Sequence, residues 1–176
     1  MGGYGSGYAL WRDRKTTVES CLTLSADKLT RDKMLAPGIW RGGTLTWTNT
    51  RTGKELSAAG YEVNTMPGRP PWLRLHYTVS RTKEAFDYKL GLTSSPTPWR
   101  TLRWFFVCPL SVGGRSCGRR VGKLYLPPGA RYYGCRHCYD LTYTSCRESH
   151  KNDAMYRGLA RDAGLSFDQV KRMMEE

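Results

Sequence analysis

The sequence predicts an α+β protein in which short N-terminal helices precede a four-stranded antiparallel β meander, a small cysteine-bearing module and a C-terminal helical hairpin. Residues 43–93 alternate apolar and polar side chains with a period of two, which predicts the strands, and helix-capping residues occur near both ends of the chain. Four cysteines between residues 108 and 138 predict the module. The 176 residues are enough for one domain or two small ones.

The N-terminal segment, residues 1–15, is rich in Gly, Tyr and Ser and has too little apolar surface to fold alone, so we expect a flexible arm. Thr16-x-x-Glu19 has the pattern of a capping box and predicts a short helix that carries Leu22. Ser25 predicts the start of a second helix. Both helices are expected to pack against the sheet.

The predicted sheet occupies most of residues 16–100, which we expect to form one helix-plus-sheet domain. Its clearest part is a hairpin, because residues 73–79 and 86–92 each place apolar side chains on one face. The opposite face is polar. His76 lies on that polar face without a second histidine or carboxylate in pattern with it, so we do not expect it to be a ligand or a base.

The four cysteines fall as Cys108-x8-Cys117 and Cys135-x2-Cys138, and they are the strongest functional signal in the chain. Structural zinc sites take four thiolate or imidazole ligands, usually as two pairs from two tight turns. The second pair has the usual spacing, whereas residues 110–116 lengthen the first pair and predict an extra loop. We therefore expect one structural Zn²⁺ bound by these four thiolates.

Other roles for the cysteines are a disulfide framework, a redox pair or buried free thiols. The chain start lacks the apolar core of a signal peptide and no apolar run could span a membrane, so we expect a reducing, cytoplasmic location. A redox pair is disfavoured because Cys135 and Cys138 do not lie between a strand and a long helix. Cys21 is expected to be a core residue. The substitute ligands left open are Cys146, His137 and His150.

The segments around the cysteines follow the order of a zinc ribbon, which is strand, knuckle, hairpin, knuckle and strand. Residues 104–107 lead into the first cysteine, residues 121–126 return from the first knuckle, and residues 131–134 lead into the second. A strand at 141–143 is expected to follow. A module of this size needs its metal to fold. We place the predicted zinc ribbon at residues 101–147.

Positive charge is concentrated in the same region. Lys and Arg outnumber Asp and Glu by 28 to 15 in the whole chain, and residues 108–150 contain seven of the basic residues against two acidic ones. Arginine neutralises phosphates and aromatic rings stack on exposed bases, so this mixture predicts a nucleic-acid surface. The alternative is a solvated basic face whose tyrosines pack the ribbon. The candidate nucleic-acid contacts are Arg115, Arg119, Arg120, Lys123, Arg131, Tyr132, Tyr133 and Arg136.

Four segments of the chain together carry a resemblance to known sequences. They are Gly2-Gly3-Tyr4-Gly5-Ser6-Gly7, Thr17-Val18-Glu19, Cys117-Gly118-Arg119-Arg120 and Cys135-Arg136-His137-Cys138-Tyr139. On these segments the chain resembles a set of uncharacterised bacterial and mobile-element proteins that have a glycine-rich N terminus and a C-terminal four-cysteine zinc ribbon. The resemblance covers nearly the whole chain, and it implies this architecture without an established activity.

The C-terminal segment, residues 148–176, predicts two helices. The first ends at Gly164, and Ser166-x-x-Gln169 is a capping box that opens the second. Residues 151–176 contain five basic and five acidic residues, so this part of the chain is neutral.

The same segment also has the spacing of a helix-turn-helix at Ala160, Gly164 and Val170, with Leu165 and Met173 expected in its core. Its neutral charge argues against a DNA-recognition helix and favours an ordinary helical hairpin. The residues that would face a DNA groove in a helix-turn-helix are Phe167, Lys171 and Arg172.

The sequence shows no pattern typical of an enzyme. A nuclease or transposase-type activity would need carboxylates assembled from distant positions such as Asp87 and Asp140, and four thiolates leave zinc no position for an activated water. We predict a non-enzymatic zinc-ribbon protein that binds DNA or RNA, as an accessory or regulatory factor of a bacterial or mobile genetic system. The alternative is a zinc-dependent adaptor whose exposed aromatic residues and ribbon dock on a protein partner. The sequence indicates neither a membrane nor a small-molecule substrate.

Overall fold

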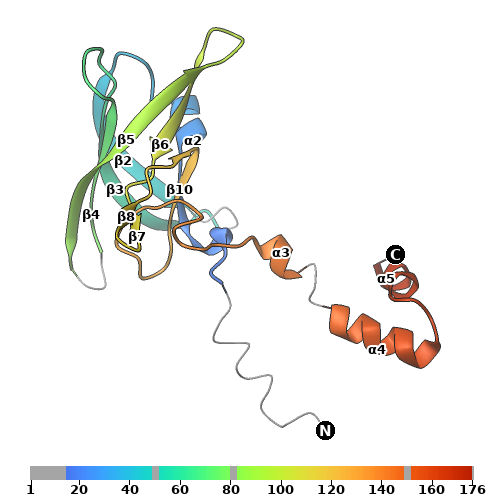
Figure 1. Ribbon diagram of the computed structural model, residues 1–176. Coiled ribbons are helices and arrows are strands. Elements are labelled where there is room, and N and C mark those ends of the chain that lie inside the picture. The colour runs from blue at the N-terminus through green and yellow to red at the C-terminus, as the bar shows by residue number, and fades with distance from the viewer. Residues whose placement is uncertain (1–14, 49–51, 80–82, 149–151, 176) are drawn as a thin grey trace. The chain divides into compact units, whose positions relative to one another are not determined.

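The computed structural model of the chain divides into two compact units (Figure 1). One unit is Ser20–Asp140, and the other joins Met1–Glu19 to Leu141–Glu176. The larger unit includes most of the predicted sheet domain and of the predicted ribbon, because strands on both sides of residue 100 belong to one sheet. Most of the predicted N-terminal arm lies outside the described residues. The residues that the structure describes are 15–48, 52–79, 83–148 and 152–175.

The larger unit is built on a curled antiparallel sheet whose strands neighbour one another in the order β2-β3-β4-β5-β6-β9 (Figure 1). The predicted α+β class and antiparallel sheet are confirmed, and the first four strands of the sheet lie where the meander was predicted. The predicted strand number is too low for the whole sheet, because β5 is long enough to pair with β4 along its first half and with β6 along its second. The strands are β2 (Trp40–Thr48), β3 (Glu55–Asn64), β4 (Trp72–Thr78), β5 (Ala85–Pro96), β6 (Leu102–Val107) and β9 (Arg120–Val121).

The predicted first helix is wrong beyond a single short turn, η1 (Val18–Ser20). Leu22 instead begins strand β1 (Leu22–Ser25), which pairs with β10 (Lys123–Leu126) in a second, two-stranded sheet. The Glu19 carboxylate accepts hydrogen bonds from the backbone and hydroxyl of Thr144, at 3.1 and 2.9 Å, rather than closing a capping box. Pairing with a strand a hundred residues away therefore outweighs the local helix signal.

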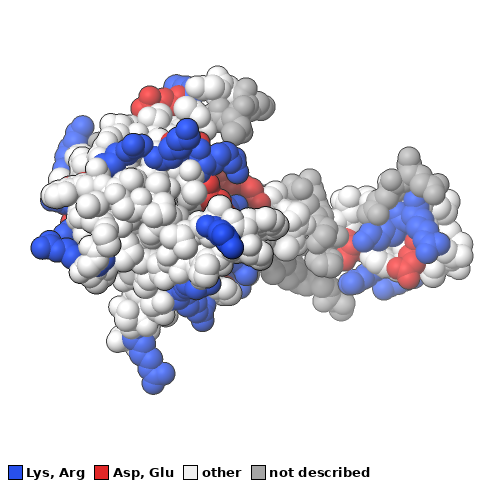
Figure 2. Space-filling model, turned by 90° about the horizontal axis from the view of Figure 1, so that it is seen from above, with Lys and Arg blue, Asp and Glu red and all other residues white. Residues whose placement is uncertain are grey.

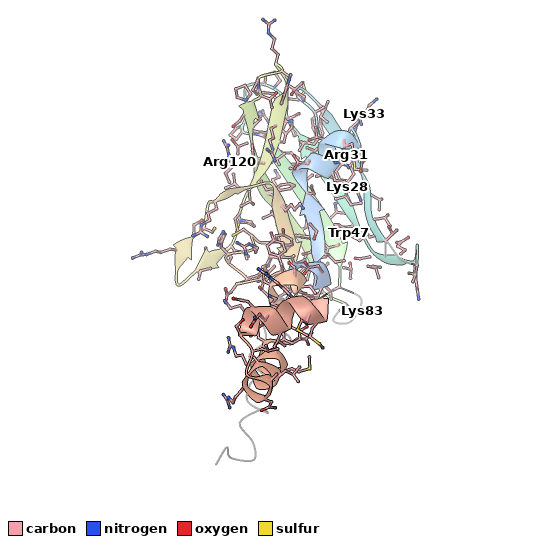
Figure 3. The ribbon with its side chains drawn as sticks, turned by 90° about the vertical axis from the view of Figure 1, so that its right-hand side faces the viewer. Lys28, Arg31, Lys33, Trp47, Lys83 and Arg120 are labelled. Carbon is pink, nitrogen blue, oxygen red and sulfur yellow. The ribbon has the colours of Figure 1, made fainter. Side chains whose placement is uncertain are left out.

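The second predicted helix is confirmed as α2 (Ala26–Arg31). The Ser25 hydroxyl accepts the Lys28 N–H at 3.4 Å, which makes Ser25 the N-cap. The backbone of Lys33 is in the left-handed region, with φ of +56°, so the chain leaves the helix direction two residues after Arg31. Figure 3 shows the basic side chains on and just after this helix.

The inner face of the sheet packs into one core. Leu73, Leu75 and Leu90 are each at most 1% exposed, as the alternation predicts. Cys108 and Cys135 belong to the same core cluster, at 1% and 0% exposure. The cysteine module therefore shares its core with the sheet and is not an appended domain.

Among its described residues, the smaller unit contains three α-helices: α3 (Thr144–Glu148), α4 (Asp153–Ala163) and α5 (Phe167–Glu175). Gly164 ends α4 in the left-handed conformation, with φ of +65°. Ser166 and Gln169 exchange the two hydrogen bonds of a capping box, at 2.9 and 3.2 Å, so both predicted helix signals are confirmed. The predicted strand at 141–143 is reduced to one bridge between Thr17 and Thr142. No helix among the described residues is long and apolar enough to cross a membrane.

The helix-turn-helix spacing is met in part. Ala160 and Val170 are buried together, as that motif requires, and Phe167 packs against them instead of facing outward. Leu165 and Met173, which the motif would bury, are 39% and 69% exposed. The pair therefore resembles a helical hairpin with an uncovered apolar side more than a complete helix-turn-helix.

Candidate metal centre

The long spacing of the first cysteine pair is taken up by a small hairpin. Gly113 and Gly114 form its turn with φ of +57° and +76°, and two successive positive φ values are typical of the type I′ turns that glycine adopts without steric cost. The Cys117 N–H donates to the Leu110 carbonyl at 2.8 Å. The predicted extra loop is thus a strand pair that returns Cys117 to the neighbourhood of Cys108. Its strands are β7 (Ser111–Val112) and β8 (Arg115–Ser116).

The second cysteine pair lies on a tight turn. The Cys138 N–H points to the Cys135 Sγ at 3.4 Å, and the Cys135 N–H points to the Cys108 Sγ at 3.3 Å. The Tyr139 N–H donates to the Cys135 carbonyl at 3.3 Å and closes the turn. Backbone N–H groups directed at sulfur favour its thiolate form. The second turn therefore directs two donors toward the group of sulfurs.

The four cysteine sulfurs converge, since their Sγ atoms all lie within 4.8 Å of one another. The Cys108–Cys138 and Cys117–Cys135 separations are 3.8 Å, and the Cys135–Cys138 separation is 3.5 Å. Four sulfurs at about 2.3 Å from one tetrahedral ion lie about 3.8 Å apart, whereas a disulfide requires about 2.05 Å. The cluster therefore could hold one metal ion, and its cysteines are free thiols.

The protein environment acts differently on the four thiols. Burial raises the pKa of Cys108 and of Cys138, because desolvation penalises the thiolate. The backbone N–H of Arg119 lowers the pKa of Cys117. A bound cation stabilises all four thiolates at once and offsets the desolvation. The donor set thus fits a soft metal ion that deprotonates its ligands.

Two tyrosine hydroxyls and one ring stack fix the segment before the second pair to the sheet. Tyr77 on β4 donates to the Arg131 carbonyl, and the Tyr133 N–H donates to the Tyr88 hydroxyl on β5 at 3.0 Å. The Tyr133 ring stacks on Trp47 of β2, with centroids 6.0 Å apart. Burial raises the pKa of Tyr77 to about 12, so its hydroxyl is a donor at neutral pH. The sheet therefore positions the cysteine turn from three of its strands.

These contacts correct one predicted nucleic-acid contact. Tyr133 is 1% exposed and cannot stack on a base, because its ring belongs to the core. Tyr132 is 44% exposed, with edge contacts to Phe86 and Tyr88. Tyr133 therefore has a structural role, whereas Tyr132 remains accessible from solvent.

The substitute metal ligands do not join the cluster. In the described parts of the chain, the only group of three or more side chains suited to a metal is Cys108, Cys117, Cys135 and Cys138. Cys146 and His137 lie outside it, and His150 lies outside the described residues. Asp87, one of the two carboxylates considered for a nuclease, is ion-paired with Arg74 at 2.5 Å.

The predicted basic contacts are exposed except for Arg136, which is half-buried. Arg131 is ion-paired with Glu84 at 3.0 Å. Arg120 (Figure 3) donates to the Ser95 hydroxyl at 2.8 Å, and its guanidinium lies 4.2 Å from the Phe105 ring centroid. Among the predicted basic contacts, no hydrogen bond or ion pair with a described residue involves the side chains of Arg115, Arg119 and Lys123.

Two arginines and one histidine lie beside the cysteine cluster. Arg115, Arg119 and His137 line one shallow hollow together with Cys117 and Cys138. On the face of the molecule seen in Figure 2, Lys and Arg side chains are spread around the larger unit, with acidic side chains in smaller groups. The hollow offers an anion several donors at once.

The outer face of the sheet carries aromatic residues that the sequence predicted only as a general docking surface for a protein partner, without naming individual residues. The Lys89 ammonium lies 4.4 Å from the Trp72 ring centroid, and Arg103 joins Arg120 over the Phe105 ring. The sequence contained a signal for this face, because the alternation that directs Leu73 toward the core directs Trp72 toward the opposite face.

Comparison of the chain with protein-family models, curated proteins and solved structures gave no match. The function must therefore be inferred from the residues of this chain. Those residues bring four sulfur ligands and a cation-lined hollow together within the unit Ser20–Asp140.

Proposed function

We propose that the chain is a zinc-ribbon protein that binds nucleic acid through the basic surface next to its metal centre. One observation carries this proposal: residues 108–139, which contain all four clustered cysteines, include six Lys or Arg residues and no Asp or Glu. Five of these six side chains are exposed. Such a surface attracts phosphates by neutralising them and releasing their counterions.

The choice of zinc rests on the ligands. Four thiolates select soft ions, and zinc accepts them in tetrahedral geometry without redox chemistry. A site closed by four sulfurs has no open position for a water nucleophile, so its contribution is to folding. The two turns that meet at the sulfurs support the choice of a ribbon, and the bound ion would join Cys108 and Cys117 to Cys135 and Cys138.

The charge of the metal and its four ligands also affects how much positive charge this surface offers to a phosphate. Four thiolates and one Zn²⁺ carry two net negative charges, and part of the neighbouring positive charge would neutralise them. The six basic residues of 108–139 exceed that need. Arg115 and Arg119 line the hollow without ion-pair partners among the described residues, so they remain available to a phosphate. Arg131 contributes less, because Glu84 already pairs with it.

Charge reversal tests the proposal. Arg115→Glu with Arg119→Glu should weaken binding to labelled DNA and RNA oligonucleotides by more than tenfold and reduce the log–log salt slope by about 2, at roughly 0.9 counterions per phosphate contact. Lys54→Glu with Arg69→Glu is the matched control, because it makes the same change in net charge at exposed positions far from the cysteines in sequence. Fluorescence anisotropy across a salt series measures both quantities, and metal analysis confirms that the variants keep their zinc.

An equal loss of affinity in both double variants would show that the interaction depends on net charge alone and not on the surface next to the metal centre. Absence of any binding at roughly 100 mM salt would overturn the proposal. The second candidate is then the zinc-dependent protein adaptor, which is favoured by a separate observation: α4 and α5 expose Met155, Leu159 and Met173 at 49%, 42% and 69%. Exposed apolar patches of this kind mark protein-interaction surfaces.

A further inference from the structure

A single row of residues crosses the whole outer face of the sheet. The strand registers place Trp40 opposite Asn64, Asn64 opposite Trp72, and Trp72 opposite Gly91. On the other side of Gly91 the row continues through Val107 to Arg120, since a side chain on Gly91 would touch Val107, and Val107 pairs with Arg120. Neighbouring strands are about 4.8 Å apart, so the two tryptophans lie roughly 10 Å apart across the sheet.

The aromatic rings of this face alternate with cations. Lys89 lies over Trp72, and Arg120 lies over Phe105, which is two residues along β6 from Val107 of the row. Trp40 is 69% exposed on the edge strand. Aromatic rings interleaved with basic side chains on a sheet are the elements that hold single strands, because bases stack on the rings while the cations follow the phosphates.

The Trp40 ring is held in place on the surface. Its indole N–H donates to the Glu62 carboxylate at 2.7 Å. Gly42, the residue opposite Glu62, has no side chain to obstruct the ring. A fixed ring loses little conformational freedom when a base stacks on it.

One arginine pairs with both acidic residues beside the row and offsets part of their charge. Arg74 makes a bidentate contact with Asp87 at 2.6 and 2.5 Å and approaches Glu62 at 3.6 Å. The Arg74 guanidinium lowers the pKa of Asp87, so this carboxylate stays ionised and paired. The cations that remain on the face, Lys89 and Arg120, have no carboxylate partner among the ion pairs of the described residues. The face is therefore complementary to a polyanion.

We propose that this outer face, along the row from Trp40 to Arg120, is a base-stacking platform for single-stranded nucleic acid. The proposal rests on the proposed function and extends it, because Arg120 belongs both to this row and to the basic segment that follows Cys117. A single strand lying on the row would place its phosphates near the ribbon and its bases on Phe105, Trp72 and Trp40. A duplex keeps its bases stacked internally and cannot use the rings.

The test compares two exposed tryptophans. Trp40→Ala should weaken binding of a labelled 20-nucleotide oligo-dT by about 5- to 100-fold, the range of one base–aromatic stack, with no change in the salt slope. Trp99→Ala is the matched control, because Trp99 is 82% exposed but lies in the connection between β5 and β6, away from the row. Its affinity should stay within about twofold of the wild type. Quenching of tryptophan fluorescence by unlabelled oligo-dT should also decrease in Trp40→Ala and persist in Trp99→Ala.

The outcomes separate the platform from the ribbon. If duplex and single strand bind alike and Trp40→Ala binds as the wild type does, the platform is refuted while the ribbon contact stands. If Trp40→Ala weakens binding but Arg115→Glu with Arg119→Glu does not, the ribbon contact fails and the platform stands. Absence of any affinity for oligo-dT refutes the platform. If the chain then binds a protein and Trp40→Ala abolishes that binding, the face serves a protein partner instead.

Discussion

Replacing Tyr88 by phenylalanine tests how the cysteine module is fixed to the sheet. The Tyr88 hydroxyl accepts the Tyr133 N–H at 3.0 Å, and Tyr133 is 1% exposed, so Tyr88→Phe leaves a buried donor without its partner. Tyr77→Phe is the matched change on the neighbouring strand. Its hydroxyl donates to the Arg131 carbonyl in an exposed bond, which water can replace. Both changes also remove the 3.4 Å contact between the Tyr77 and Tyr88 hydroxyls, so this loss is common to the two variants.

The difference in magnitude follows from burial. A buried donor left unsatisfied costs about 1–3 kcal/mol, whereas an exposed hydrogen bond that water replaces contributes about 0.5–1 kcal/mol. One kcal/mol shifts Tm by about 4 °C for a domain of this size. We therefore expect Tm to fall by about 4–12 °C in Tyr88→Phe and by less than about 4 °C in Tyr77→Phe.

The measurement is thermal unfolding followed by circular dichroism, with both variants saturated with zinc. Metal analysis of the same samples shows whether the cysteine cluster is intact, because a variant that loses its metal would be destabilised for another reason. Equal Tm values, or a larger decrease for Tyr77→Phe than for Tyr88→Phe, would contradict the assignment of the Tyr133 N–H as the critical buried donor.

Three further changes test the centre, the sheet face and the C-terminal unit. Cys135→Ser should lose the bound metal and more than about 3 kcal/mol of stability, whereas Cys21→Ser should keep one metal ion per chain by metal analysis; full metal in Cys135→Ser would exclude the four-sulfur site. The Asp87 pKa is lowered by Arg74, so its pairing stabilises the fold above the unfolded pKa of about 3.9 and this contribution is lost as pH falls through the folded pKa. Urea midpoints of Asp87→Asn should lie below the wild type at pH 7 and converge with it near pH 2, and a constant difference would contradict the pairing. Ser166→Ala should cost about 0.5–2 kcal/mol in the C-terminal unit, visible as reduced helical circular dichroism, and unchanged helicity would show that the cap is dispensable.

Local patterns in the sequence were sufficient for much of this protein. The alternation of Leu73, Leu75 and Leu90 with polar neighbours fixes which face of the hairpin is buried, because the side-chain period of a strand is two. Ser25 and Ser166 begin helices because a cap acts on backbone groups only two or three residues away. The cysteine spacing predicted the cluster for the same reason, since each pair lies on one turn or one short hairpin.

Only the tertiary structure decided the features that depend on distant partners. Leu22 lies in a strand because β10 supplies hydrogen bonds that the local helix signal cannot match, and β6 joins the sheet because β5 extends past β4. Tyr132 and Tyr133 are adjacent residues of the same type, so the sequence does not distinguish their roles. Packing against Trp47 and the bond to Tyr88 bury Tyr133, whereas Tyr132 stays exposed. Strand pairing and burial join residues far apart in the chain, and no pattern within a few neighbouring residues encodes which partner they meet.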